Sequence, residues 1–139
     1  MDEPIVRILA VDDYKPWRVF VASMLQKQPK LRIISEGTNG LEAVQIAQQL
    51  QPDVILLDIG LPKLNGLEAA RRILRSAPNT KILFVSEQRS ADIAVEALPT
   101  GACGYVIKSH AASELLPAIE AVLQGKQFVS AGLTSLGYL

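Results

Sequence analysis

The sequence has little of several residue types, and each shortage excludes a class of protein. Its single cysteine, Cys103, excludes an internal disulfide and a cysteine-based metal site. No apolar run approaches the roughly 20 residues that span a bilayer. The 14 Lys and Arg residues balance 14 Asp and Glu residues, without a basic cluster, so we expect no nucleic-acid contact by this segment through a broad basic face. Residues 1–4 are acidic and unlike a signal peptide, so we expect a soluble, cytoplasmic domain with no membrane partner.

What the sequence does have is an alternation of two hydrophobic patterns. Hydrophobic residues make up 49% of the 139 residues, enough to build one domain around a substantial core. Continuous apolar runs predict strands at residues 5–11, 31–34, 54–57, 81–85 and 103–107. Apolar residues spaced three or four apart predict helices within residues 17–25, 41–50, 67–77, 91–98 and 115–123.

This alternation predicts an α/β fold, namely a doubly wound, five-stranded parallel sheet with five helices on its two faces. Of the common strand orders, 2-1-3-4-5 (flavodoxin-like) suits five strands best. We predict one domain over residues 1–125. Residues 126–139 are less periodic, and we predict a C-terminal tail or the start of a linker there, with a short helix as an alternative.

Polar side chains stand at the ends of four of the predicted strands. Asp12 and Asp13 follow the first strand, Asp58 the third, Ser86 the fourth and Lys108 the fifth. In a parallel sheet these ends share the edge where open α/β sheets bind ligands. Three carboxylates repel one another, and a hard divalent cation such as Mg²⁺ relieves that repulsion. An ammonium and a hydroxyl beside them suit a phosphoryl group, which a carboxylate can accept as an acyl phosphate. Taken singly, each residue has a structural alternative as a helix cap, a solvated hydroxyl or an ion-pair partner.

Four motifs occur in order along residues 5–125: Val-Asp-Asp at 11–13, Leu-Asp-Ile-Gly-Leu-Pro at 57–62 with Asn-Gly at 65–66, Ser86, and Gly-Ala-Cys-Gly-Tyr-Val-Ile-Lys at 101–108. With these motifs the chain resembles the receiver domain of two-component response regulators. Residues 101–108 and 125–130 are most similar to the subclass whose receivers precede a LuxR/NarL-type helix-turn-helix domain.

The resemblance implies a role for each residue at the predicted edge. Asp58 would be the phosphoacceptor in a phosphorelay, receiving the phosphoryl group from a sensor histidine kinase or a phosphotransfer protein. Asp12, Asp13 and Asp58, with the backbone carbonyl of Gly60, would bind Mg²⁺, with Mn²⁺ as an alternative. The domain would be no enzyme beyond catalysing its own phosphorylation and dephosphorylation.

The resemblance also implies a switch. Lys108 and Ser86 would contact the phosphoryl group, and Ser86 with Tyr105 would change position on phosphorylation. The change would control a partner or an attached transcriptional output domain, and DNA would be reached only through a helix-turn-helix domain outside this segment. A homodimer is left open.

One departure from the family pattern concerns access to the site. Glu87 follows Ser86 where receivers commonly carry a small residue, and its carboxylate would modulate access to the site. The alternative reading is therefore a degenerate receiver that binds partners without phosphorylation. A metal-dependent phosphohydrolase is a third hypothesis, disfavoured because no connection is long enough to form a cap. We expect Trp17 to face the core, near enough for its fluorescence to report metal binding, and His110 to lie at the surface.

Overall fold

The centre of the molecule is a parallel sheet that runs through residues 4–133, the part of the chain that the computed structural model describes. Six strands lie there in the order β2-β1-β3-β4-β5-β6. Their bounds are β1 (Val6–Val11), β2 (Leu31–Gly37), β3 (Val54–Leu57), β4 (Lys81–Ser86), β5 (Gly104–Ile107) and β6 (Phe128–Val129). The predicted fold and the order of the first five strands are confirmed. The one difference is the sixth strand, where we predicted five.

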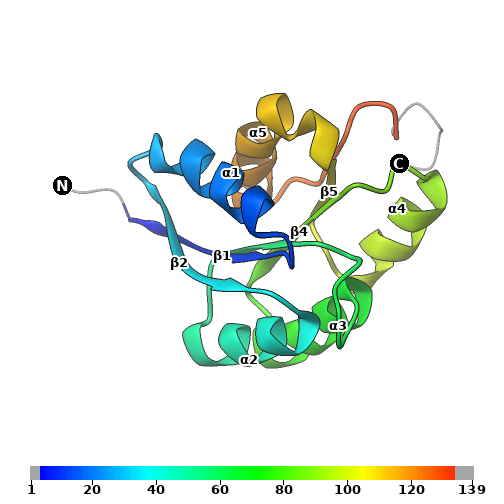
Figure 1. The fold of residues 1–139 in the computed structure, drawn as a ribbon, viewed down its shortest axis with the longest axis horizontal. Helices are drawn as coiled ribbons and strands as arrows, with labels where there is room; N and C mark the ends of the chain where they lie inside the picture. Colours follow the sequence, from blue (N-terminus) through cyan, green and yellow to red (C-terminus); the bar gives the residue numbers. More distant parts are fainter. Residues whose placement is uncertain (1–3, 134–139) are drawn as a thin grey trace.

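Helices cover both faces of the sheet. Figure 1 shows α1 and α5 on one face and α2, α3 and α4 on the other. The helices within residues 4–133 are α1 (Lys15–Gln26), α2 (Gly40–Leu50), α3 (Gly66–Ser76), α4 (Ala91–Ala97) and α5 (Ala111–Leu123), with two short 3₁₀ turns, η1 (Leu98–Thr100) and η2 (Lys108–His110). In the described part of the chain, no helix has the length and apolar character needed to traverse a lipid bilayer.

The central strand β3 shows why its sequence is a continuous apolar run. Val54 and Leu56 pack with α1 and α5, whereas Ile55 and Leu57 pack with α2 and α3, and all four side chains are buried. A strand covered on both faces needs apolar residues at every position, because neighbouring side chains point to opposite faces. The core therefore has two halves, separated by the sheet.

The added strand β6 lies on the outer edge of β5. Phe128 pairs with Gly104 in parallel register, and a Cβ atom at position 104 would come within 2.5 Å of the Phe128 carbonyl oxygen, so glycine permits this close approach. Farther along, the Ser130 hydroxyl accepts a hydrogen bond from the Ile107 N–H at 2.8 Å, and Leu133 is buried. Residues 126–133 thus pack against the sheet. The predicted boundary at residue 125 remains a prediction, and residues 134–139 lie outside the described part of the chain.

Candidate functional site

The ends of β1 and β3 bring two carboxylates to the same edge of the sheet. Val11 pairs with Leu57 in the parallel register, so the residues that follow them, Asp12 and Asp58, leave neighbouring strands at the same level. Backbone hydrogen bonds continue at this level, because the Asp58 N–H donates to the Val11 carbonyl at 3.2 Å. The position of both carboxylates is therefore set by the ladder of the sheet.

Three carboxylates gather at this edge. Single oxygens of Asp12, Asp13 and Asp58 all lie within 4.8 Å of one another. Asp12 is buried, Asp58 is half-buried and Asp13 is exposed. The Asp12 Oδ1 atom accepts a hydrogen bond from the Tyr14 N–H at 2.9 Å, and the Asp58 Oδ1 atom accepts one from the Ile59 N–H at 2.7 Å. These bonds leave the Oδ2 atoms of Asp12 and Asp58 for other partners.

Lys108 supplies the cation at this edge. Its ammonium Nζ lies 2.6 Å from Asp12 Oδ2 and 3.5 Å from Asp58 Oδ2, and its side chain is 11% exposed. Apart from this ion pair, Asp12 Oδ2 is buried and accepts no hydrogen bond. A buried carboxylate oxygen with lone pairs to spare is an oxygen ligand available to a cation.

The charges of the site shift the pKa values of its members. Burial raises the pKa of Asp58 above its ordinary value, and the nearby Asp12 charge also raises it, while the Lys108 ammonium only partly offsets them. For Lys108, burial acts to lower the pKa, but the hydrogen bond to Asp12 and the charges of Asp58 and Asp12 outweigh it, so the pKa is raised. Lys108 is therefore a cation at neutral pH.

Ser86 and Tyr105 lie beside the carboxylates, on β4 and β5. Ser86 is buried at the end of β4, and its hydroxyl accepts a hydrogen bond from the Gln88 N–H at 3.2 Å. The Tyr105 ring is fully buried, and its hydroxyl donates to the Gln88 carbonyl at 2.8 Å. Burial raises the pKa of the Tyr105 hydroxyl. The two predicted switch residues thus meet at one main-chain unit, Gln88. Sequence reasoning missed this residue, because its backbone makes the contacts and its side-chain type carries no signal.

The loop after β3 is held close to Asp58 by the start of α3. The Gly66 N–H donates to the Ile59 carbonyl at 2.7 Å, and a Cβ atom at position 66 would come within 2.1 Å of the Asp58 carbonyl oxygen. The Asn65 side chain caps the helix by accepting a hydrogen bond from the Glu68 N–H at 3.0 Å. The Asn-Gly pair of the sequence therefore fixes the main chain that carries Asp58.

The carboxylates line an open cleft of about 470 Å³, whose lining also includes Gly60, Ser86, Glu87 and Lys108. Glu87 is exposed on it, and its charge contributes to the raised pKa of Lys108. Every predicted site residue except Tyr105 lines this cleft, and Tyr105 lies buried next to it. His110 is half-buried, with its Nδ1 atom 3.7 Å from Glu114 Oε2 on α5.

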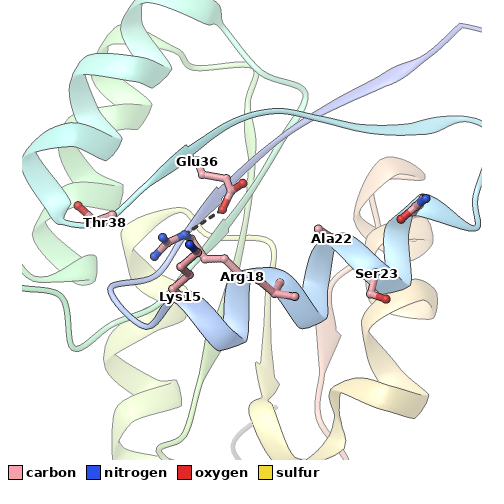
Figure 2. A pocket seen from close by; sticks show the side chains of 8 residues that line it. Lys15, Arg18, Ala22, Ser23, Glu36 and Thr38 are labelled. Atoms are coloured by element: carbon pink, nitrogen blue, oxygen red, sulfur yellow. Dashed lines mark hydrogen bonds and ion pairs between the residues drawn. The ribbon is translucent and has the colours of Figure 1, made fainter.

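A second hollow lies away from the carboxylates, between α1 and β2. Figure 2 shows Arg18 reaching from α1 toward Glu36 across it. Sequence reasoning left Arg18 without a role, and its contacts are with the main chain of Asp12 and with Glu36.

Comparisons with known proteins agree with this fold. A family model described as "Response regulator receiver domain" matches residues 8–120. The chain is 33% identical over 134 residues to "Transcriptional regulatory protein DegU" of Brevibacillus brevis, a match that covers 96% of this chain and 57% of that protein. It is 38% identical over 117 residues to "Protein-glutamate methylesterase/protein-glutamine glutaminase" of Thermotoga maritima, covering 83% of this chain and 34% of that protein.

Among solved structures, the chain is similar to a LuxR-family two-component response regulator from Aurantimonas sp. SI85-9A1. The identity is 30%, the TM-score is 0.90, and the match covers 94% of each chain. By contrast, the chain spans little more than half, 57%, of the length of the Brevibacillus relative.

Proposed function

Because this chain belongs to the response regulator receiver domain family, in its LuxR/NarL-type subclass, we propose that it is the phosphoacceptor domain of a phosphorelay, switched by Mg²⁺-dependent phosphorylation of Asp58. The observation that carries the proposal is the meeting of three carboxylates and one ammonium at the carboxyl edge of the sheet. Receiver domains are signalling domains, and the function of this one is to carry a phosphoryl group as a signal.

Asp58 is the acceptor in this proposal. A carboxylate oxygen of Asp58 attacks the phosphorus atom of a phosphohistidine on a sensor kinase or phosphotransfer protein. A P–O bond forms, the P–N bond breaks, and the imidazole of the donor leaves with the electron pair. The half-buried position of Asp58, next to Lys108 and open to the cleft, supports this role. The exposed Asp13 and the buried Asp12 lack this combination.

The same carboxylates would hold Mg²⁺, or Mn²⁺ in its place. Asp12, Asp13 and Asp58, together with the backbone carbonyl of Gly60, form the proposed ligand set. The fit rests on hard oxygen donors within 4.8 Å of one another and on the buried Asp12 Oδ2 atom, which accepts no hydrogen bond apart from its ion pair with Lys108. When bound, the cation supplies positive charge to the phosphoryl oxygens and relieves the repulsion among the carboxylates.

Lys108 and Ser86 would contact the phosphoryl group once it is on Asp58. The Lys108 ammonium neutralises negative charge, and the Ser86 hydroxyl donates a hydrogen bond. Ser86 and Tyr105 would act as the switch, a role supported by their common contact with the main chain of Gln88. Glu87, exposed on the cleft, would modulate the access of phosphodonors through its negative charge.

The output would belong to a longer protein. The relative from Brevibacillus brevis is named a transcriptional regulatory protein, and this chain spans 57% of its length. We propose a receiver over residues 1–125, with residues 126–139 leading toward a transcriptional output domain that would contact DNA. The working location would be the cytoplasm, and a homodimer is a compatible assembly.

A degenerate receiver, which binds partners without being phosphorylated, is the second candidate, and Glu87 on the cleft favours it. A receiver that only binds partners would keep the fold and lose the reaction. The enzymatic relative from Thermotoga is matched over only 34% of its length, so its named activity does not transfer to this chain.

The test is phosphorylation by acetyl phosphate with Mg²⁺, followed by intact-mass measurement. We expect the wild type to gain the mass of one phosphoryl group, Asp58→Asn to gain none, and the surface control Asp92→Asn to behave as the wild type. A wild-type protein that reacts neither with acetyl phosphate nor with a cognate kinase would support the degenerate receiver instead.

A further inference from the structure

Two adjacent residues of α1 contact the two residues of the central ion pair, Asp12 and Lys108. Arg18 Nη1 donates a hydrogen bond to the main-chain carbonyl of Asp12 at 2.6 Å. The Trp17 ring centroid lies 5.0 Å from the Lys108 ammonium. Asp12 and Lys108 are themselves an ion pair at 2.6 Å. One turn of one helix therefore touches both members of the central ion pair, and the proposed function uses neither Arg18 nor Trp17.

Arg18 is held at two points. Besides its bond to Asp12, its Nε atom donates to Glu36 Oε1 at 2.9 Å, and its side chain is only 14% exposed. Glu36 belongs to β2, where it pairs with Ala10 of β1 two residues before Asp12. Figure 2 shows the arginine extending from α1 to this glutamate. A planar guanidinium with several fixed donors can join two such acceptors, whereas a lysine offers one flexible point charge. Arg18 thus ties the main chain of Asp12 to β2.

Packing against the core holds the Trp17 side chain in place. It is half-buried, packs against the cluster of α1 and α5, and lies 5.1 Å from the Phe20 ring, centroid to centroid. A cation within about 6 Å of an aromatic ring centroid is attracted to the negative face of the ring. The Lys108 side chain is 11% exposed, so this attraction acts with little competition from water. The tryptophan thereby limits the positions that the ammonium can take.

We propose that Arg18 and Trp17 are positioning residues of the phosphorylation site. Arg18 fixes the metal-binding carboxylate Asp12 through its main chain, and Trp17 fixes the ammonium of Lys108. The proposal rests on the proposed function, and it assigns each residue to a different step. Arg18 acts on cation binding, whereas Trp17 acts on the transfer of the phosphoryl group.

The affinity of the site for a divalent cation shows whether Arg18 acts by positioning Asp12 or only through its charge. Removing a positive charge near three carboxylates would by itself tighten cation binding, because it removes a repulsion. Loss of positioning has the opposite sign, since Asp12 loses its fixed geometry. We expect Arg18→Met and Arg18→Lys both to weaken Mn²⁺ binding by roughly 10- to 100-fold, as for one charge-assisted hydrogen bond. The affinity is measured from the free Mn²⁺ signal in electron paramagnetic resonance.

The matched control for Arg18 is Arg72→Met. Arg72 also lies on a helix and also pairs with a glutamate, its Nε atom being 3.2 Å from Glu68 Oε2, but it is exposed on α3. This control should bind Mn²⁺ as the wild type does. Wild-type or tighter Mn²⁺ binding by Arg18→Met, in a variant that unfolds as cooperatively as the control, would overturn the role given to Arg18.

The test of Trp17 compares Trp17→Leu with the conservative variant Trp17→Phe. We expect the leucine variant to be phosphorylated by acetyl phosphate about 3- to 10-fold more slowly than the wild type, and the phenylalanine variant to regain most of the rate, because its ring keeps the attraction for the cation. Equal rates for wild type and Trp17→Leu would overturn this role.

A nuclear magnetic resonance measurement tests the contact between Trp17 and Lys108 even in a protein that is not phosphorylated. The ε-methylene hydrogens of Lys108 should resonate upfield of those of the exposed Lys126, owing to the tryptophan ring, and should lose this shift in Trp17→Leu. Coincident Lys108 and Lys126 shifts in the wild type would overturn the contact itself. If the wild type is not phosphorylated but the Mn²⁺ and resonance results are as expected, the proposed function and the role of Trp17 in phosphoryl transfer are refuted. The role of Arg18 in cation binding and the contact between Trp17 and Lys108 then still stand.

Discussion

Removing the ammonium of Lys108 should destabilise the protein and make its stability depend on divalent cations. The Nζ atom is 2.6 Å from Asp12 Oδ2 and 3.5 Å from Asp58 Oδ2. At an effective dielectric constant of about 20, these contacts correspond to about 6 and about 5 kcal/mol of attraction. The cost of removing the charges from water offsets most of this, and breaking a buried pair typically costs about 3–5 kcal/mol. Because the cleft is open, we expect Lys108→Met to lose about 3 kcal/mol, the lower end of that range.

The assay is urea unfolding at pH 7 with a chelator present, beside the exposed control Lys126→Met. The loss arises from ionised carboxylates left without their cation, so it should be present at neutral pH and shrink in acid as Asp58, whose pKa burial raises, becomes protonated. Saturating Mg²⁺ should raise the stability of Lys108→Met more than that of the wild type, since the cation replaces the missing positive charge. A variant as stable as Lys126→Met in chelator, or a loss that Mg²⁺ leaves unchanged, would refute this reasoning.

Three further variants probe the site and the sixth strand. Burial raises the pKa of Asp58, so the contribution of its protonated form to stability is present in acid and is lost as the pH rises through the folded-state pKa. In urea unfolding, Asp58→Asn should therefore be more stable than the wild type at pH 7 and equal to it near pH 3. Equal stabilities at pH 7 would contradict this. Gly66→Ala should weaken Mn²⁺ binding at least about 10-fold, because its Cβ atom would meet the Asp58 carbonyl oxygen at 2.1 Å. The control Gly37→Ala, whose Cβ atom would come no nearer than 3.5 Å to a neighbour, should bind Mn²⁺ normally, and similar affinities for the two variants would argue against a fixed loop. Leu133→Ala should lower the free energy of unfolding by about 2–4 kcal/mol, since Leu133 is buried against the core, and an unchanged denaturation midpoint would mean that this segment is not part of the folded unit.

The positions of the site residues could be predicted because strand ends carry them. Once the apolar runs predict parallel neighbours, the register that pairs Val11 with Leu57 follows from the sheet, and the carboxylates of Asp12 and Asp58 must meet. The part played by Gln88 could not be predicted. Its N–H and carbonyl contact Ser86 and Tyr105, and any residue type supplies those groups.

Helix α2 shows where hydrophobic periodicity misleads. The sequence predicts a stripe of Leu41, Val44, Ala47 and Leu50, but Leu41 is 48% exposed and Leu50 is 37% exposed. The buried side chains are Ala43 and Ala47, which belong to the core half that α2 shares with α3. Small residues allow the two helices to approach closely, so size rather than hydrophobicity selects the inward face.

The sixth strand is too short for hydrophobic periodicity to predict it. Phe128 and Val129 are two residues, too few for an alternating pattern, and Gly104, the pairing partner of Phe128, gives no hydrophobic signal. The contact that secures the segment is Ser130, whose hydroxyl donates to Glu114 of α5 while it accepts from Ile107 of β5. A serine and a glutamate 16 residues apart do not identify each other in a single sequence.

The central claim is that Asp58 accepts a phosphoryl group, and locating the modified residue tests it most directly. After reaction with acetyl phosphate and Mg²⁺, borohydride reduction converts an aspartyl phosphate to homoserine, which tandem mass spectrometry of peptides can place in the sequence. The account predicts homoserine at position 58, dependent on Mg²⁺, with Asp12 and Asp13 unmodified. Homoserine at either of those positions, or none in a wild-type protein incubated with both acetyl phosphate and a cognate kinase, would contradict it.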